Sequence, residues 1–363
     1  MKILLLGEFS SLHKYLKEGL KSIGYDVVLV SSGDGWKKIG EGDYPLYFNR
    51  SNINNKLIEP LYLYKEAKYI IEKLGDFDVI QLINPRIYHP FINAKLIKKI
   101  MKKGTLISLL CCGNDLALNR AYKNNLFEYY MMDGDNSLAN EYNPLRPRGL
   151  VTRLTEGSII DKCDVIIPTA YEYSIGYKNN IKLSKVVPMP INVDSIQYKE
   201  NFVSDKIVIF HGVSREGVKG TAYIRAALEK VKNVYSDKVE VIIDGHMPFE
   251  QYTKIMQKAN IVIDQCLSYA YGINADIAMA QGKIVMSGAR IETLNALEVE
   301  NCPIFSIKPD VNQIYNTIEY IIKNKDKIPK WGMESRKYVE RIHDCKKVAR
   351  KFVEVWGIKD NDK

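Results

Sequence analysis

The chain has 363 residues, which is more than one hydrophobic core usually organises, so two domains are expected. Apolar residues make up 46% and charged residues 26%, a balance that excludes a mainly disordered or fibrous chain. Lys and Arg number 52 against 43 Asp and Glu. For this length, the net charge of +9 is too small to indicate a nucleic-acid-binding protein.

The cysteines and the apolar runs indicate a cytoplasmic protein. The six cysteines contain no CxxC pair, and no Cys/His cluster has zinc-finger spacing, so we expect reduced thiols. The first apolar run meets Glu8 and is too short for a signal-peptide core. The longest clear uncharged run, 104–114, is well short of the roughly 20 residues that span a bilayer.

The first half of the chain alternates apolar strands with amphipathic helices. Residues 2–7 and 26–32 read as buried strands, and between them apolar residues recur at helical spacing up to Gly24. Further strands are expected at 78–83, 105–111 and 164–169, after helices at 60–74, 91–103 and 152–162. This alternation predicts a doubly wound α/β sheet with right-handed crossovers. Residues 115–150 break it and read as a loop-rich insertion with one helix.

The second half repeats the architecture after a proline-containing segment, 185–195, that reads as a short strand entering a linker. Strands are expected at 206–212, 238–245, 260–266, 283–288 and 302–307, and helices at 222–234, 248–258, 274–282, 311–323 and 334–356. The chain therefore predicts two doubly wound Rossmann-like domains facing across a cleft. Ligands of open α/β sheets bind at the carboxyl ends of the strands.

The turn after the first strand is one candidate site. Gly7 permits a tight turn, Ser10 or Ser11 can cap the following helix, and amides at the helix start can hold an anion. Plain capping without a ligand is the alternative. His13 would lie in the first helical turn, facing the cleft or solvent. The turn lacks the GxGxxG pattern of dinucleotide-binding domains, so the sequence gives no support for a dinucleotide-dependent dehydrogenase.

A second candidate site, 211–220, follows a buried strand and opens a helix. Arg215 and Lys219 supply positive charge there, and the helix start adds its own partial charge. Such a turn suits a diphosphate, because Arg offers a fork of donors and Lys a mobile charge. The alternative is a solvated turn. In a third segment, Gly272 and Asn274 precede a helix of small residues whose free amides could face an anion. A tightly packed core helix is the alternative there.

Three segments of the sequence resemble the GT-B glycosyltransferases of group 1, a retaining-type family. Pro190, Asn192, Val193 and Asp194 resemble its linker-entry motif. HGVSREGVKGTAYIRAAL, 211–228, resembles the turn that binds the donor diphosphate, and YGINADIAMAQGKIVMSG, 271–288, resembles the donor loop and helix. The chain would form a divergent branch, since the family's paired glutamates align with Tyr269 and Ile277. Asp276 lies one position from the second, which on a helix is a rotation of about 100°.

The resemblance implies roles for individual residues. Arg215 and Lys219 would stabilise the leaving diphosphate, and Asp115 would act as base or acceptor-hydroxyl partner. His13 and Asn114 would lie on the acceptor side. The donor would contact Gly7, Ser10, His211, Gly212, Ser214, Gly220, Tyr271, Gly272, Ile273, Asn274 and Asp276. No metal and no cofactor are expected beyond the nucleoside-diphosphate sugar itself, because Asp133-Gly134-Asp135 falls in the insertion and reads as a turn.

The resemblance also implies domains and an activity. Residues 1–188 would bind the acceptor, 189–335 the nucleotide sugar, and 336–363 would form a helix packing back on the first domain. The enzyme would transfer a sugar to a glycan, lipid-linked or protein-linked acceptor in bacterial surface-polysaccharide or glycoconjugate synthesis. A non-catalytic nucleotide-sugar-binding partner subunit and a nucleotide-sugar epimerase of the same fold are the alternatives.

The densest positive charge lies in the helix expected at 91–103. Lys95, Lys98, Lys99, Lys102 and Lys103 alternate there with apolar residues. A basic flank beside an apolar stripe can contact an anionic membrane, so the protein could lie peripherally at the inner face of the membrane. The alternative is an ordinary βα-unit helix with a solvated face.

Overall fold

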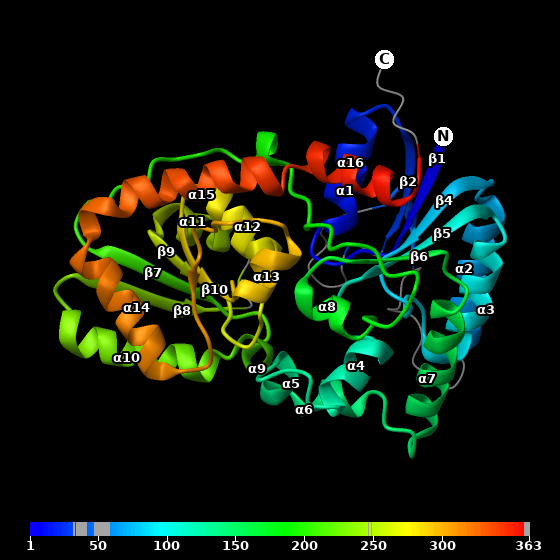
Figure 1. Cartoon of the computed structure of the whole chain (residues 1–363), viewed down its shortest axis with the longest axis horizontal. Coiled ribbons are helices and arrows are strands. Elements are labelled where there is room, and N and C mark those ends of the chain that lie inside the picture. Colours follow the sequence, from blue (N-terminus) through cyan, green and yellow to red (C-terminus); the bar gives the residue numbers. More distant parts are fainter. Residues whose placement is uncertain (32, 34–41, 47–58, 246, 248, 359–363) are drawn as a thin grey trace. The chain divides into compact units, whose positions relative to one another are not determined.

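The computed structural model describes residues 1–31, 33, 42–46, 59–245, 247 and 249–358. The chain divides into two compact units (Figure 1). Unit 1 comprises Met1–Asn124, Leu138–Pro190 and Cys345–Lys363, and unit 2 comprises Asn125–Ser137 and Ile191–Asp344. Residues 32 and 248, expected to end a strand and begin a helix, lie outside the described residues.

Unit 1 is built on a parallel sheet with the strand order β3-β2-β1-β4-β5-β6. Its strands are β1 (Lys2–Leu6), β2 (Asp26–Ser31), β3 (Tyr44–Pro45), β4 (Phe77–Leu82), β5 (Gly104–Cys111) and β6 (Val165–Pro168). The central strand β1 is buried from Ile3 to Leu6, as its uninterrupted apolar run requires. The order reverses between β1 and β4, which places the switch point of the sheet there.

Helices cover both faces of this sheet (Figure 1). They are α1 (Leu12–Ser22), α2 (Glu59–Lys73), α3 (Pro90–Met101), α4 (Leu116–Lys123), α7 (Pro147–Ile160), α8 (Tyr171–Ile175) and α16 (Cys345–Val355), with α6 (Asn136–Asn140) at the border with unit 2. α1 packs on α16, where Gly19 leaves no room for a Cβ against the Cys345 carbonyl. α3 packs between α2 and α7.

Unit 2 holds a second parallel sheet, with the order β11-β10-β9-β7-β8. Its strands are β7 (Ile207–Gly212), β8 (Val239–Asp244), β9 (Ile261–Ile263), β10 (Ile284–Ser287) and β11 (Phe305–Ser306). Isoleucines of β7 and β9 and of α14 form much of its core, including Ile209, Ile261 and Ile318, each fully buried. The order reverses between β7 and β9, which is the switch point of this sheet.

The helices of unit 2 surround that sheet (Figure 1). They are α5 (Met131–Gly134), α9 (Glu216–Lys219), α10 (Thr221–Tyr235), α11 (Phe249–Lys258), α12 (Ile273–Ala280), α13 (Ile291–Ala296), α14 (Val311–Lys323) and α15 (Ile328–Ile342), with short 3-10 turns η3 (Val193–Ser195) and η4 (Lys325–Lys327). α10 packs on α14 and α12 on α15. The small residues Ala275, Ala278 and Ala280 of α12 are buried.

The α/β class with two parallel sheets is confirmed, and three local predictions are wrong. Residues 185–195 form no strand, and only an isolated bridge joins Ile191 to Asp344. The insertion 115–150 contains α4, α5 and α6 instead of one helix. The helix expected at 334–356 is divided, because the Ile191 amide donates to the His343 carbonyl (2.8 Å) and the backbone there joins the bridge.

Part of that insertion, 125–137, groups with unit 2 through specific contacts. α5 packs on α9, where Gly134 and Gly217 approach so closely that a Cβ on either would overlap the other's carbonyl. The Glu128 amide donates to the Tyr269 hydroxyl (2.9 Å), and the Glu128 carboxylate pairs with Arg290 (2.7 Å). Segment 125–137 therefore belongs to the fold of unit 2, although unit 1 precedes and follows it in the chain.

Candidate functional site

The strongest candidate site lies at the switch point of the unit 2 sheet. The turn after β7 carries Arg215 and leads through α9 to Lys219. The neighbouring strand β9 is followed directly by Asp264. In open α/β sheets, ligands bind outside the carboxyl ends of the strands that flank the switch point. The residues predicted for the donor diphosphate thus lie where this topology places a ligand.

Lys219 and Asp264 form a buried ion pair at this point. Lys219 Nζ lies 2.9 Å from Asp264 Oδ1, and the two side chains are only 10% and 5% exposed. The Cys266 amide donates to the Lys219 carbonyl (3.1 Å), which fixes α9 against the segment after β9. Ser287 Oγ lies 3.4 Å from the second Asp264 oxygen. The ion pair is therefore formed by residues that follow β7 and β9, and Ser287 of β10 lies beside its carboxylate.

The start of α12 adjoins the same carboxylate. Gly272 caps α12, and a Cβ built on it would lie 3.9 Å from Asp264 Oδ2. Ile273 is buried, and Asn274 is exposed. The fold thus places both Lys219 and Gly272 next to Asp264, although they are 53 residues apart in the sequence. The sequence prediction omitted Asp264, whose signal was a single acid directly after the buried apolar strand Ile261–Ile263.

The turn between β7 and α10 presents Arg215 outward. Arg215 is exposed at the N-cap position of α9, and within the described residues its guanidinium has no ion pair. Gly212 and Ser214 are half-buried beside it. Gly220 has a φ of +70°, and a Cβ there would lie 2.5 Å from Cys266 Sγ, so both conformation and space require glycine. The turn offers one free cation, Arg215, and one buried cation, Lys219.

His211 has a structural position. Nδ1 donates to the Ile263 carbonyl (2.8 Å), so Nε2 accepts from the Thr221 hydroxyl (2.9 Å). Burial lowers the pKa of His211 to about 4, which keeps the ring neutral. Both ring nitrogens are occupied in joining β7 to β9 and α10.

Tyr271 and Asp276 face α15 inside unit 2. The Tyr271 hydroxyl lies 2.7 Å from the Tyr338 hydroxyl and 3.0 Å from His343 Nε2. Asp276 is fully buried, 3.5 Å from the same His343 nitrogen, and in the described residues its carboxyl oxygens have no hydrogen-bond partner. Burial and the nearby Asp264 raise the pKa of Asp276 well above its usual value. The raised pKa favours the neutral form of its carboxyl group.

In unit 1, the Glu8 carboxylate, from the turn after β1, occupies the start of helix α1. Glu8 Oε1 accepts from the His13 amide (3.2 Å) and Oε2 from the Lys14 amide (2.8 Å), so Glu8 caps α1. The expected cap by Ser11 is wrong, because Ser11 has a φ of +68° and its side chain makes no cap bond. Gly7 and Ser10 also have positive φ, 89° and 53°. The helix start already holds a carboxylate.

His13 was expected to face the cleft or solvent, but it lies inside unit 1. It is fully buried, and Nδ1 donates to the Gly7 carbonyl (2.7 Å). Burial lowers the pKa of His13 to about 3, so the ring is neutral. Nε2 has no hydrogen-bond partner in the part of the chain that the structure describes. Because Nδ1 carries the proton, Nε2 carries a lone pair that could accept a hydrogen bond.

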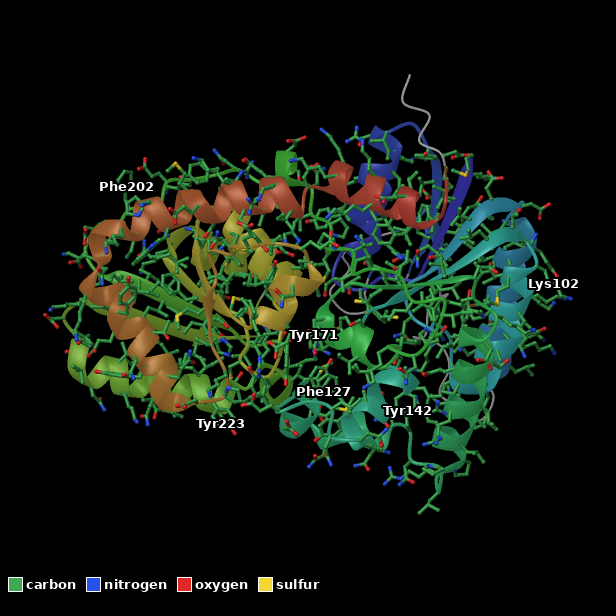
Figure 2. The ribbon with its side chains drawn as sticks, viewed as in Figure 1. Lys102, Phe127, Tyr142, Tyr171, Phe202 and Tyr223 are labelled. Carbon is green, nitrogen blue, oxygen red and sulfur yellow. The ribbon has the colours of Figure 1, made fainter. Side chains whose placement is uncertain are left out.

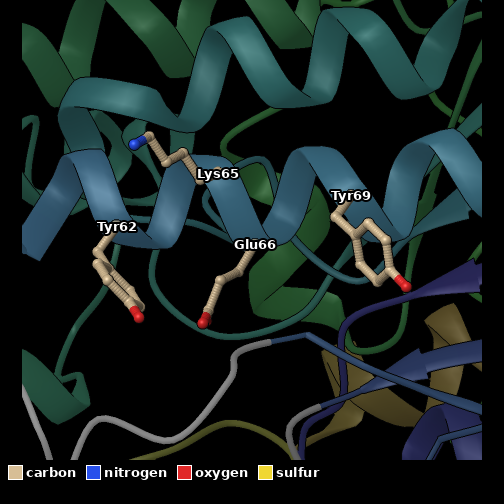
Figure 3. Close-up of a pocket in the computed structure, with 4 residues that line it drawn as sticks. All are labelled: Tyr62, Lys65, Glu66 and Tyr69. Carbon is tan, nitrogen blue, oxygen red and sulfur yellow. The ribbon is translucent and has the colours of Figure 1, made fainter.

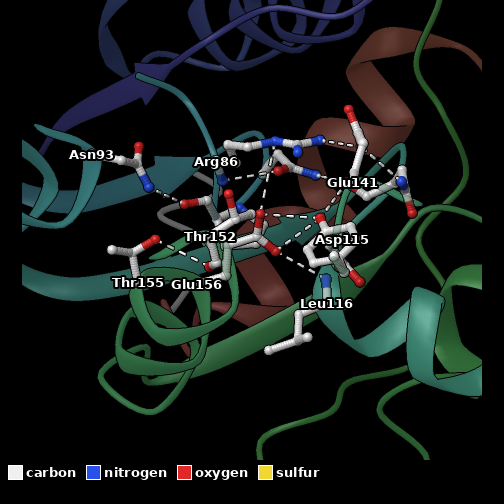
Figure 4. Close-up of polar contacts among 12 residues, drawn as sticks. Arg86, Asn93, Asp115, Leu116, Glu141, Thr152, Thr155 and Glu156 are labelled. Atoms are coloured by element: carbon white, nitrogen blue, oxygen red, sulfur yellow. Dashed lines mark hydrogen bonds and ion pairs between the residues drawn. The ribbon is translucent and has the colours of Figure 1, made fainter. Parts of the chain in front are cut away.

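A polar network lies at the carboxyl ends of β4 and β5 (Figure 4). Glu156 accepts from the Leu116 amide (2.9 Å) and from the Tyr142 hydroxyl (3.0 Å to each oxygen). Arg86 lies 3.7 Å from Glu156 and 3.0 Å from Glu141. Burial raises the pKa of Glu156 to about 8, so its neutral form predominates at neutral pH.

Asn114 and Asp115 adjoin this network. Asn114 Nδ2 donates to the Leu138 carbonyl (3.1 Å) and to Glu141 (2.9 Å). Asp115 caps α4 by accepting from the Leu118 amide (2.8 Å), and it also accepts from the Tyr177 hydroxyl (2.7 Å). Asp115 is 2% exposed, and burial raises its pKa. Its oxygens are thus committed to the fold.

Other surface features lie apart from these residues. A hollow of about 440 Å³ runs along α2, lined among the described residues by Tyr62, Lys65, Glu66 and Tyr69, of which the two rings and Glu66 point to one side (Figure 3). Across the described residues, no cluster of three His, Cys, Asp or Glu side chains has the arrangement of a metal site. None of the described helices is both long and apolar enough to cross a membrane.

Comparisons with known proteins give no family model and no curated protein that matches the sequence. Solved structures do match over nearly the whole chain. Sucrose-phosphate synthase from Thermosynechococcus elongatus has a TM-score of 0.61 at 15% identity, covering 98% of each chain. Anabaena HepE in complex with UDP-glucose has a TM-score of 0.60 at 13% identity, covering 98% of this chain and 99% of HepE.

An epimerase has the same architecture. UDP-GlcNAc 2-epimerase from Neisseria meningitidis, bound to UDP-GlcNAc, has a TM-score of 0.52 at 14% identity and is covered to 99%. These likenesses span both units and join transferases with epimerases, so they establish architecture and leave the reaction open. With its two parallel Rossmann-like sheets, this chain has the GT-B fold.

Proposed function

We propose that the protein is a glycosyltransferase that takes its sugar from a nucleoside-diphosphate donor. The observation that carries the proposal is the grouping of Lys219, Asp264 and the start of α12 at the switch point of the unit 2 sheet. Neighbours of the same fold are crystallised with UDP and UDP-glucose, which supports a nucleotide sugar as ligand.

The chemistry follows from the charge that develops on the leaving diphosphate. Fixed donors aimed at that charge are the main way in which a protein accelerates such a step. Lys219 supplies a point charge, Arg215 an exposed fork of donors, and the first amides of α12 add the partial charge of a helix start. Asp264 is a positioning residue that holds Lys219 until the diphosphate shares it. The mechanism assigned here requires no metal ion.

The acceptor is proposed to be a glycan or a lipid-linked or protein-linked saccharide. The support is the resemblance of 186–288 to group 1 glycosyltransferases, which build bacterial surface polysaccharides and glycoconjugates. An acceptor contact is proposed for Asn114, whose Oδ1 is buried without a partner in the described residues, and His13, being fully buried, lies behind that surface. We place the enzyme in the cytoplasm, where nucleotide sugars would be its donors.

Epimerisation of a nucleotide sugar is the second candidate, since UDP-GlcNAc 2-epimerases match with TM-scores of 0.52. Incubation with the donor alone separates the two reactions. An epimerase converts the donor into its epimer and needs no acceptor, whereas a transferase releases nucleoside diphosphate at a rate that depends on the acceptor. A partner subunit without activity would bind the donor and convert nothing.

Isothermal titration with UDP-, GDP-, CMP- and dTDP-sugars tests the donor site. One nucleotide class should bind to the wild type, and Arg215→Ala and Lys219→Ala should each weaken its binding by about tenfold or more, as expected for charge-assisted bonds of about 1.5–3 kcal/mol. Lys232→Ala, an exposed lysine of α10, is the matched control and should bind like the wild type. Wild-type affinity in both site variants would contradict the assignment.

A further inference from the structure

Unit 1 exposes three leucines, one just before α7 and two within it. Leu145 is 90% exposed, Leu154 66% and Leu150 45%. Arginines alternate with them in the sequence LRPRGLVTRL. We call Leu145, Arg146, Arg148, Leu150, Arg153 and Leu154 the leucine–arginine surface. Single exposed leucines are common, but three within ten residues form a feature that needs an account.

The geometry of α7 places its two exposed leucines on one side of the helix, and Leu145 and Arg146 lie directly before the helix. At about 100° per residue, Leu150 and Leu154 lie about 40° apart on the exposed face. Arg153 lies beside the two leucines, about 60° from Leu150, whereas Arg148 in the first turn lies about 160° from Leu150, at the edge of the buried face. The opposite face, with Thr152, Glu156 and Ile159, is buried. An apolar stripe with one cation beside it and two more at the helix start is similar to the pattern of a helix that lies in a membrane interface.

The charged residues of the leucine–arginine surface are all arginines, so its charge is positive. Residues 145–155 contain three arginines and no Asp or Glu, and the next acid, Glu156, is buried. In the described part of the chain, none of the three guanidinium groups lies within ion-pair distance of a carboxylate, and Arg153 reaches only the Tyr142 carbonyl, at 3.5 Å. The arginines are therefore available to anions outside the chain.

We propose that the leucine–arginine surface binds the anionic headgroup region of a phospholipid bilayer. Leucine is under-represented in the centres of protein–protein interfaces, which favour Trp and Tyr, and this surface has neither. Exposed leucines insert shallowly at the boundary of headgroups and acyl chains, while arginines bind phosphate in a bidentate manner. The contact is independent of the transferase reaction, and it would hold the protein close to membrane-bound molecules.

The lysines at and after the end of α3, for which membrane contact was one of two interpretations, contribute less. Lys98 and Lys99 are half-buried, and Lys103 Nζ donates to the Leu74 carbonyl (2.6 Å). Lys95 lies over the Tyr64 ring. Lys102 is exposed and points outward (Figure 2). α3 packs on α7, so its lysines add positive charge to the surroundings of the leucine–arginine surface without a comparable set of exposed leucines.

Vesicle co-sedimentation of the full chain tests the proposal. The wild type should sediment with phosphatidylcholine vesicles that contain about one-third phosphatidylglycerol, and not with pure phosphatidylcholine, because anionic lipid attracts each basic residue. The variant Leu145→Ser/Leu150→Ser/Leu154→Ser should bind at least about fivefold less, and Arg146→Gln/Arg148→Gln similarly. These side chains are exposed, so both variants should retain wild-type circular dichroism and thermal unfolding.

Two controls make the result specific. Val234→Ser removes an apolar side chain of unit 2 that is 59% exposed and should leave sedimentation unchanged. Lys98→Gln/Lys99→Gln/Lys102→Gln should reduce binding less than the leucine variant does. The proposal is overturned if the wild type does not sediment with anionic vesicles, or if the leucine variant sediments like the wild type. A surface that instead contacts a protein would give the first of these outcomes.

Discussion

Replacement of Lys219 by methionine separates the stability of unit 2 from its capacity to bind a nucleotide. Lys219 is paired with Asp264 at 2.9 Å, and both side chains are almost entirely buried. Lys219→Met would leave the Asp264 carboxylate with only the Ser287 hydroxyl, at 3.4 Å, among the described side chains. Breaking a buried pair in this way typically costs about 3–5 kcal/mol.

The double variant Lys219→Met/Asp264→Leu removes both charges together. Apolar replacement of a buried ion pair is often close to neutral, so we expect it to recover most of the loss, to within about 1 kcal/mol of the wild type. Its affinity for the nucleotide sugar should nevertheless stay low, because the ammonium group is absent. This combination of normal stability and weak binding is expected if the Lys219–Asp264 pair belongs to the donor site, and not if it only stabilises the fold.

Urea denaturation can be followed in unit 2 alone. The chain has three tryptophans, and Trp331 packs against Phe305 and Tyr320 inside unit 2. A background of Trp36→Phe and Trp356→Phe leaves Trp331 as the only tryptophan reporter. The reasoning fails if Lys219→Met costs less than about 1 kcal/mol, or if the double variant is no more stable than the single one. Wild-type nucleotide affinity in the double variant would remove Lys219 from the donor site.

Three further predictions concern the surroundings of the sites. The folded-state pKa of Glu156 is raised to about 8 from 4.5, so this group stabilises unit 1 at low pH, and the stability falls by up to about 1.4 kcal/mol per pH unit as pH rises through that window. Glu156→Gln should flatten the pH profile of stability, measured by urea denaturation in a Trp36→Phe/Trp331→Phe background that leaves Trp356 as the only tryptophan. Glu8→Ala should cost unit 1 about 1–2 kcal/mol in the same assay, because it uncaps α1. Gly134→Ala should speed hydrogen exchange in segment 125–137, since its Cβ overlaps the Gly217 carbonyl, whereas Gly157→Ala, with its nearest neighbour at 3.9 Å, should not. An unchanged pH profile in Glu156→Gln, unchanged stability in Glu8→Ala, or unchanged hydrogen exchange in Gly134→Ala would contradict the respective prediction.

The arrangement of strands was predictable because it depends on patterns that repeat along the chain. Continuous apolar runs such as 2–7 can only be buried strands in an α/β protein, and the structure has β1 there. The short edge strand β3 was missed, since Tyr44–Pro45 has no periodicity to detect. The break at His343 was also missed, because it depends on a bridge to Ile191, more than 150 positions away by subtraction. Local sequence carries no trace of such a pairing.

The turns that carry the candidate residues were predictable in position, but the contacts of their side chains were not. The turns after β1 and β7 follow from topology, and the structure places Gly7 and Arg215 in them. Which side chain occupies a helix start is decided by backbone angles, so Glu8 and not Ser11 caps α1. The partner of Lys219 lies 45 positions further along the chain, a pairing that only the register of β7 and β9 establishes.

Tyr269 occupies the position that the resemblance to group 1 aligns with a glutamate. Its ring contacts Phe127 and Tyr129, its hydroxyl accepts from the Glu128 amide, and Arg290 lies 4.3 Å from its centre. A carboxylate could not replace these aromatic contacts, so a glutamate here would release segment 125–137 from unit 2. The same segment places α5 on α9, directly beside the turn that ends in Lys219. Tyr269 thus helps to hold α5 against α9, beside the turn whose Arg215 and Lys219 are proposed to bind the diphosphate.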